Sequence, residues 1–202
     1  MEEALSSKMD IKAFIFDMDG LLFDSERIVQ RSWEMAGDEL GIPHMGDVIY
    51  HTLGMNRTGR NEYFRKYIRE DFPFEEFGRL TRDNFWKIVD KEGLPLKKGI
   101  KELLAYGKAQ GYKMAVATSS SREYAMGNLI RARIDSYFDS VVCGDMVKKA
   151  KPDPEIYQKA SESLGIPPEY CMAFEDAPGG ILSAHQAGMK VIMVPDLVQP
   201  TE

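Results

Sequence analysis

The sequence has few of the residues that mark specialised protein classes. It holds 2 cysteines and 3 histidines in 202 residues, and His44, His51 and His185 are too scattered to suggest a metal-ligand set. No apolar run approaches the length of a membrane span, and the N-terminus lacks the basic-then-apolar layout of a signal peptide. We therefore expect a cytoplasmic protein, with Cys143 and Cys171 as free thiols in buried strands.

Basic residues are outnumbered by acidic ones, with 26 Lys and Arg against 32 Asp and Glu. The formal net charge is −6 and the isoelectric point is near 5.2. No basic stripe with interleaved aromatic residues is present, so a nucleic-acid surface is disfavoured. No membrane or protein partner is implied, and an anionic ligand would have to rely on local positive groups.

Short apolar runs alternate with helical patterns in most of the chain. Val, Ile, Phe, Met and Ala are concentrated in five runs that predict buried strands at about 11–17, 112–118, 139–143, 170–174 and 189–194. Helices are predicted near 99–110, 121–134, 153–164 and 178–187. This alternation is typical of an α/β fold with a doubly wound parallel sheet and a Rossmann-like core.

Residues 25–93 break the alternation. They contain no convincing buried strand and show helical periodicity instead, with Gly93 and Pro95 marking the end of the segment. We expect two domains: an α/β core formed by 1–24 and 94–202, and an inserted helical domain formed by 25–93.

Acidic residues follow two of the predicted strands. Asp17 and Asp19 come after the first strand, and Glu175 and Asp176 end the fourth. Two carboxylates about 4 Å apart repel by roughly 4 kcal/mol at an effective dielectric near 20, so a shared cation is expected if the strand ends are neighbours. Oxygen ligands favour Mg²⁺ over Zn²⁺. A single Asp-x-Asp is more often turn chemistry, but two acidic strand ends are harder to assign to turns.

Hydroxyl residues follow the second strand. Ser120 and Glu123 have the spacing of a capping box that would open the next helix. A hydroxyl and free N–H groups at a helix start suit a phosphate, although a well-capped helix with no ligand explains the pattern equally well.

A lysine lies in the loop before the helix predicted at 153–164. In the segment 149–155 a proline is expected at the first helical position, which would direct Lys151 toward the carboxyl edge of the sheet. A loop lysine is usually solvated, but beside a carboxylate cluster it could offset negative charge.

These pieces together resemble the haloacid dehalogenase superfamily. The matching motifs are Asp17-Met-Asp19-Gly-Leu-Leu-Phe-Asp-Ser, Thr118, Lys151-Pro and Phe174-Glu175-Asp176, in the order and spacing of that family. A helical insertion after the first strand resembles its small-cap class. Gly-Leu-Leu-Phe-Asp-Ser-Glu and Glu-Asp-Ala-Pro-Gly-Gly-Ile are similar to the branch with β-phosphoglucomutases and sugar-phosphate phosphatases.

The resemblance implies three catalytic residues. Asp17 would be the nucleophile that forms an aspartyl-phosphate, and Asp19 would protonate the leaving alcohol and then activate water. Lys151 would neutralise charge at the nucleophile.

The same resemblance implies the binding residues. Mg²⁺ would be held by Asp17, the backbone carbonyl of Asp19, and Asp176, with Glu175 as a ligand or in the surrounding shell. Phosphate oxygens would be held by Thr118 and the N–H of Ser119. Arg57, in Gly54-Met-Asn-Arg57, matches an arginine that contacts the nontransferring phosphate in the mutases, although it could equally be solvated.

The expected activity is a Mg²⁺-dependent phosphatase acting on a small phosphorylated metabolite, a sugar or polyol monophosphate. The family's dehalogenating members carry another residue at the position of Asp19, which disfavours dehalogenation. The mutases of the family carry a histidine at the position of Val29. Because this chain lacks that histidine, β-phosphoglucomutase activity is kept only as the alternative to a phosphatase. A second alternative is a non-catalytic member that binds a phosphorylated ligand.

Overall fold

The computed structural model describes residues 10–52 and 57–196, which fold as two compact units. Unit 1 contains 10–22 and 97–194. Unit 2 contains 23–52, 57–96 and the short segment 195–196.

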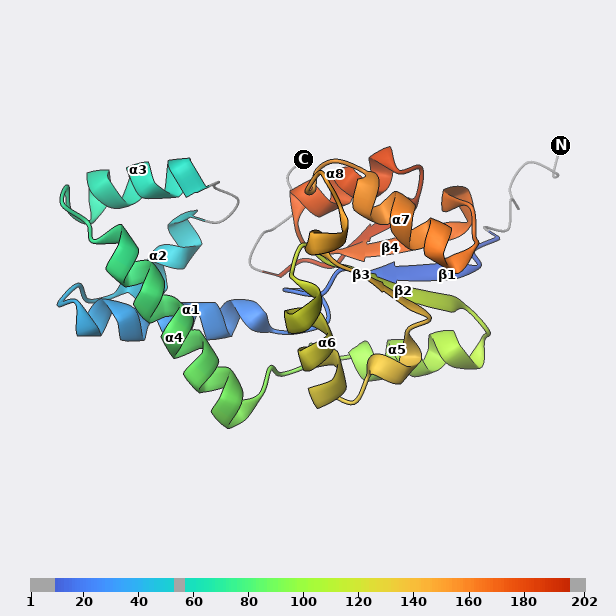
Figure 1. Ribbon diagram of the computed structural model, residues 1–202, viewed down its shortest axis with the longest axis horizontal. Helices are drawn as coiled ribbons and strands as arrows, with labels where there is room; N and C mark the ends of the chain where they lie inside the picture. Colours follow the sequence, from blue (N-terminus) through green and yellow to red (C-terminus); the bar gives the residue numbers. More distant parts are fainter. Residues whose placement is uncertain (1–9, 53–56, 197–202) are drawn as a thin grey trace, which may run out of the picture. The chain divides into compact units, whose positions relative to one another are not determined.

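Unit 1 is built on a five-stranded parallel sheet (Figure 1). The strands are β1 (Ala13–Phe16), β2 (Lys113–Ala117), β3 (Ser140–Val142), β4 (Cys171–Glu175) and β5 (Lys190–Met193). Their order in the sheet is β3-β2-β1-β4-β5, and every neighbouring pair is parallel. The predicted α/β fold with a parallel sheet is confirmed. The strand order reverses between β1 and β4, and open α/β sheets bind ligands beyond the carboxyl ends of the strands at such a reversal.

Helices cover both faces of this sheet. They are α5 (Ile100–Ala109), α6 (Arg122–Arg131), α7 (Glu155–Leu164) and α8 (Pro178–Gln186), with short 3₁₀ turns η1 (Asp135–Tyr137), η2 (Gly144–Met146) and η3 (Pro168–Tyr170). Figure 1 shows α7 and α8 on one side of the sheet and α5 and α6 on the other. Burial on both faces explains why the strands read as continuous apolar runs.

Side chains of the central strand alternate between the two faces. Ala13 and Ile15 belong to the core cluster formed with α7 and α8. Phe14 and Phe16 point to the other face, where the Phe16 and Phe174 rings stack with centroids 4.9 Å apart. The side chains that follow in sequence therefore have a fixed direction, and Asp17 is on the same side as Ile15.

Two helix starts differ from the sequence-based prediction. The capping box at Ser120 and Glu123 is wrong, because α6 begins at Arg122 and Ser121 is its N-cap, with its side chain accepting from the Tyr124 N–H. Proline at the first helical position of α7 is also wrong. This helix begins at Glu155, whose N–H is accepted by Asp153 Oδ1, so the chain turns into the helix after Pro154.

The two cysteines are buried free thiols, as predicted. Cys143 follows β3 and Cys171 begins β4. Burial raises the pKa of the Cys171 thiol to about 11, so it stays protonated at neutral pH.

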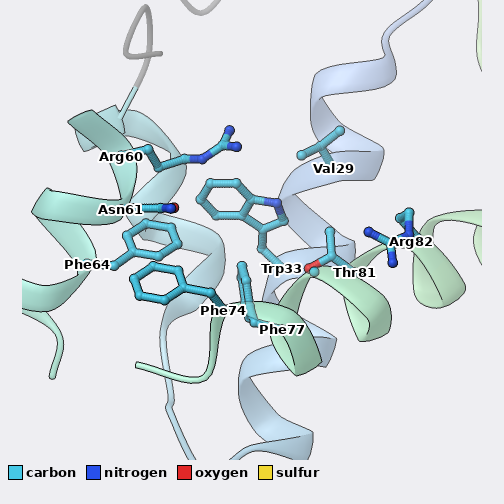
Figure 2. Close-up of a pocket in the computed structure, with 10 residues that line it drawn as sticks. Val29, Trp33, Arg60, Asn61, Phe64, Phe74, Phe77, Thr81 and Arg82 are labelled. Atoms are coloured by element: carbon cyan, nitrogen blue, oxygen red, sulfur yellow. The ribbon is translucent and has the colours of Figure 1, made fainter. Parts of the chain in front are cut away.

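Unit 2 consists of α1 (Ser25–Glu39), α2 (Met45–Thr52), α3 (Arg57–Tyr67) and α4 (Phe74–Glu92). Its core is rich in aromatic side chains, among them Trp33, Phe64, Phe72 and Phe77. Figure 2 shows three of these rings, Trp33, Phe64 and Phe77, where they line a pocket of this unit. Across residues 10–52 and 57–196, no helix combines the length and the apolar character needed to cross a bilayer.

Candidate active site

The ends of β1 and β4 bring two acidic residues side by side. Phe16 pairs with Phe174 in the parallel register, and the Asp17 N–H donates to the Phe174 carbonyl at 3.0 Å. The next residues, Asp17 and Glu175, are therefore neighbours with side chains on the face covered by α7. The convergence of the two strand ends, predicted from the sequence, is confirmed.

Asp176 completes a cluster of three carboxylates. Asp17, Glu175 and Asp176 each offer an oxygen, and these oxygens lie within 4.8 Å of one another. Asp17 and Glu175 are buried, with Glu175 only 1% exposed. Oxygen-only ligands in this number suit a hard divalent cation that keeps some water, as Mg²⁺ does. The donor set therefore fits the predicted ion.

Two glycines give the carboxylates room. Gly20 has φ +84°, and a Cβ there would overlap Asp176 Oδ2. A Cβ on Gly180, in the first turn of α8, would overlap the carboxylate of Glu175. A side chain at either position would displace an acid of the cluster.

Lys151 joins this cluster from the loop before α7. Its Nζ lies 2.5 Å from Asp17 Oδ1 and 2.6 Å from Glu175 Oε1, and it also donates to the Ala117 carbonyl at 2.9 Å. The lysine side chain is only 10% exposed. It is therefore a buried partner of the acids, and the alternative of a solvated loop lysine is ruled out.

Tyr157 is a member of the site that the sequence analysis missed. This side chain of α7 is fully buried, and its Oη donates to Glu175 Oε1 at 2.5 Å. Lys151 Nζ in turn donates to the Tyr157 oxygen at 3.4 Å. The sequence could have indicated this role, because Tyr157 lies between Ile156 and Ala160 on the side of α7 that faces the sheet. A phenol buried there needs a hydrogen-bond partner.

Burial dominates the electrostatics of the cluster. It raises the pKa of Asp17 well above the usual range; Lys151 acts in the opposite direction, while Glu175 and Asp176 raise it further. Burial lowers the pKa of Lys151, but the charges of Asp17 and Glu175 outweigh it and the net pKa is raised. Lys151 therefore stays protonated, and one ammonium faces an excess of negative charge that a bound cation would reduce.

Asp19 points to a different set of partners. Ser120 Oγ donates to its Oδ2 at 2.7 Å, and Tyr124 Oη donates to its Oδ1 at 3.1 Å. Its carboxylate is not one of the three that form the acidic cluster. Ser120, predicted as a helix cap, is instead a partner of this acid.

The loop after β2 holds Thr118 and Ser119. Thr118 is buried, and its Oγ1 accepts from the Ser120 N–H at 3.1 Å, so its own proton is available to a ligand. Across the described residues, the Ser119 N–H has no hydrogen-bond partner. The loop lies tightly on Gly144, where a Cβ would overlap the Ser119 carbonyl.

Arg57 cannot be placed in the site. It is the first residue of α3, but its side chain lies outside the described part of the structure, as do residues 54–56.

Comparisons with known proteins all point to the same family. The family model described as haloacid dehalogenase-like hydrolase matches residues 14–194. A protein of Thermotoga maritima named phosphorylated carbohydrates phosphatase is 32% identical over 182 residues, which are 90% of this chain and 84% of that protein.

Solved structures with the same fold include CbbY from Rhodobacter sphaeroides in complex with phosphate. It is 27% identical, with a TM-score of 0.70, and the match covers 95% of this chain and 90% of that one. A β-phosphoglucomutase from Clostridium difficile is 25% identical with a TM-score of 0.68, covering 92% of this chain and 85% of the other.

Proposed function

This chain belongs to the haloacid dehalogenase-like hydrolases, and from that premise we propose that it is a Mg²⁺-dependent phosphatase of a sugar or polyol monophosphate. The reaction would proceed through an aspartyl-phosphate on Asp17. The observation that carries this proposal is the buried contact of Lys151 with both Asp17 and Glu175 at the carboxyl ends of β1 and β4.

In the proposed first step, Asp17 attacks phosphorus in line while the bond to the alcohol oxygen breaks. Asp19 donates a proton to that leaving oxygen. Thr118 and the Ser119 N–H bind phosphate oxygens, and Lys151 offsets the negative charge near the nucleophile. In the second step, Asp19 takes a proton from water, which attacks phosphorus and releases Asp17 as a carboxylate.

The metal would be held by Asp17, Glu175 and Asp176, with the Asp19 carbonyl as a further ligand. When bound, Mg²⁺ would neutralise charge on the phosphate and the carboxylates, which is a major part of catalysis in phosphoryl transfer. The oxygen-only donor set and the excess of buried acid support this assignment.

The names of the relatives support the substrate class. The Thermotoga protein is named for phosphorylated carbohydrates, and the Rhodobacter structure contains phosphate. Since both match more than four fifths of this chain and of their own length, we carry the class of small phosphorylated carbohydrates over to this chain as a proposal.

β-Phosphoglucomutase is the second candidate, because the Clostridium mutase shares the fold. Val29 argues against mutase activity. It stands where the mutases carry a histidine, and a valine side chain has no group able to exchange a proton. A phosphatase therefore fits this chain better.

The decisive test measures phosphate release from a panel of sugar and polyol monophosphates, with Asp17→Asn as the matched control. We expect Mg²⁺-dependent release by the wild type, none by Asp17→Asn, and loss of turnover in excess chelator. Interconversion of glucose 1-phosphate and glucose 6-phosphate without release would favour the mutase. Full activity in chelator would remove the metal from the mechanism.

A thermal-shift experiment distinguishes a catalytic phosphatase from a non-catalytic member of the family. Beryllofluoride with Mg²⁺ mimics a phosphoryl group on an aspartate, and a ligand that binds only the folded state raises the melting temperature. We expect a shift for the wild type and none for Asp17→Asn. Absence of a shift in the wild type would favour the non-catalytic alternative.

A further inference from the structure

A loop, and not a helix or strand, determines where Lys151 lies. This Lys151 loop spans 147–154, between η2 and α7. From it the lysine side chain reaches Asp17, Glu175 and the Ala117 carbonyl, all within 2.9 Å of its Nζ. The effect of an ammonium on a neighbouring charge depends on their separation, so whatever fixes the loop also decides how well Lys151 stabilises the reacting groups.

Ser183, on α8, binds the Lys151 loop. Its side chain is fully buried, and its Oγ donates to the Asp153 carbonyl at 2.6 Å. A serine inside a helix usually donates to a carbonyl of its own helix, as Ser161 of α7 does with the Gln158 carbonyl at 2.9 Å. The Ser183 hydroxyl instead joins two residues that are 30 positions apart in the chain.

Two prolines stiffen the loop at the point where Ser183 binds it. Pro152 and Pro154 flank Asp153. A proline ring fixes φ of its own residue and restricts the residue before it, so the backbone of Lys151 and Asp153 has little freedom. A shift of the Asp153 carbonyl is therefore passed on to Lys151, two residues away, instead of being absorbed between them.

The carboxylate of Glu155 contacts the other end of the loop. It accepts from the N–H groups of Lys148 and Lys149 at 3.1 and 2.9 Å. These bonds are local, because they join residues at most 7 positions apart. They hold the shape of the loop, whereas the Ser183 bond fixes the loop against a different helix.

That helix also forms one wall of the acidic cluster. Gly180 of α8 lies against Glu175, so closely that a Cβ there would overlap the carboxylate. Ser183 follows Gly180 by three residues, and residues three apart are neighbours on the surface of a helix. One side of α8 therefore fixes both Glu175 and the loop that carries Lys151.

We propose that Ser183 is a positioning residue for Lys151. Its hydrogen bond holds the Lys151 loop against α8, so that Nζ stays beside Asp17 while the phosphoryl group is transferred. The inference rests on the proposed phosphatase function, in which Lys151 offsets negative charge near the nucleophile. Because Lys151 acts on the reacting groups, loss of the Ser183 bond lowers kcat and leaves KM nearly unchanged.

The kinetic test compares Ser183→Ala with Ser161→Ala in the full chain, with p-nitrophenyl phosphate and Mg²⁺. Each substitution removes a buried hydroxyl and its hydrogen bond, so the melting temperature should fall to a similar extent in both. We expect kcat to fall about tenfold for Ser183→Ala and to keep its wild-type value for Ser161→Ala. KM should change less than about twofold in either variant.

A second measurement reports on Lys151 directly and needs no turnover. Trace acetylation with acetic anhydride, followed by mass spectrometry of peptides, gives a labelling rate for each lysine. The Lys151 side chain is 10% exposed, whereas that of Lys149, in the same loop, is 73% exposed and serves as the reference. Ser183→Ala should raise the Lys151 rate about tenfold relative to Lys149, because a buried hydrogen bond no longer opposes opening of the loop. Ser161→Ala should leave the ratio unchanged.

Two results would overturn the proposal. They are an unchanged Lys151 labelling rate in Ser183→Ala, or a loss of kcat that is equal in Ser183→Ala and Ser161→Ala. If the wild type releases no phosphate, the phosphatase proposal fails, and the labelling rate still decides whether Ser183 positions Lys151. If the wild type is active and Ser183→Ala has the same kcat, the positioning role is rejected and the phosphatase proposal stands.

Discussion

Tyr157 Oη lies 2.5 Å from Glu175 Oε1, and both side chains are almost fully buried. Burial raises the pKa of Tyr157 well above its usual range, and the negative charge of Glu175 raises it further, so the phenol remains a donor at every working pH. This neutral donor holds a buried carboxylate in place beside Lys151.

Tyr157→Phe removes that hydrogen bond, and with it the longer one that the phenol oxygen accepts from Lys151 Nζ. We expect the free energy of unfolding to fall by about 1.5–3 kcal/mol, because a hydrogen bond to a buried charge is lost. Urea denaturation measures this change, with Tyr106→Phe as the control, since Tyr106 is 53% exposed. Equal stability of the two variants would show that the Tyr157 contact contributes nothing.

The raised pKa of Asp17 predicts an unusual pH dependence. Burial is the main cause, so the folded, metal-free protein holds the Asp17 proton more tightly than the unfolded chain does. Its contribution to stability is present below the unfolded pKa, near 4, and is lost as pH rises through the folded pKa. In chelator, wild-type stability should fall over this range relative to Asp17→Asn. Urea denaturation at a series of pH values above 4 measures the free energy of unfolding of both proteins. Parallel pH dependence of wild type and Asp17→Asn would contradict this prediction.

Two adjacent glycines in α8 predict opposite effects. A Cβ on Gly180 would overlap the Glu175 carboxylate, whereas a Cβ on Gly179 meets nothing within 4 Å. Gly180→Ala should lower the free energy of unfolding by about 1–3 kcal/mol and abolish Mg²⁺-dependent activity, because Glu175 must move. Gly179→Ala should keep full activity and gain up to about 1 kcal/mol from helix propensity. Melting temperatures and phosphate release measure both. Similar behaviour of the two variants would refute this difference.

The partners of Asp19 predict a leaving-group effect. Tyr124→Phe removes a hydrogen bond that the Asp19 carboxylate accepts from the phenol. We expect kcat/KM for a sugar phosphate to fall about tenfold, because a misplaced acid protonates the poor leaving group less well. The loss should be smaller with p-nitrophenyl phosphate, whose leaving group needs no proton. An equal loss with both substrates would assign Tyr124 a purely structural role.

Much of the fold could be predicted from the sequence. The five apolar runs became strands because a sheet covered on both faces needs continuous apolar segments, and short apolar runs alternating with helices favour a parallel sheet. The meeting of Asp17 and Glu175 follows from the same logic, since parallel strands end at one edge. The helix starts were less accurate, because Ser120 and Ser121 are both acceptable caps and local sequence does not choose between them.

The sequence by itself determined which residues end the strands, and hence that acids, hydroxyls and a lysine gather at one edge of a parallel sheet. Only the tertiary structure decided that Ser120 and Tyr124 hold Asp19 and that Tyr157 holds Glu175. The physical reason is that the two features depend on residues at different separations along the chain. Backbone periodicity is a local property, whereas the partner of a buried polar group comes from whichever distant element packs against it.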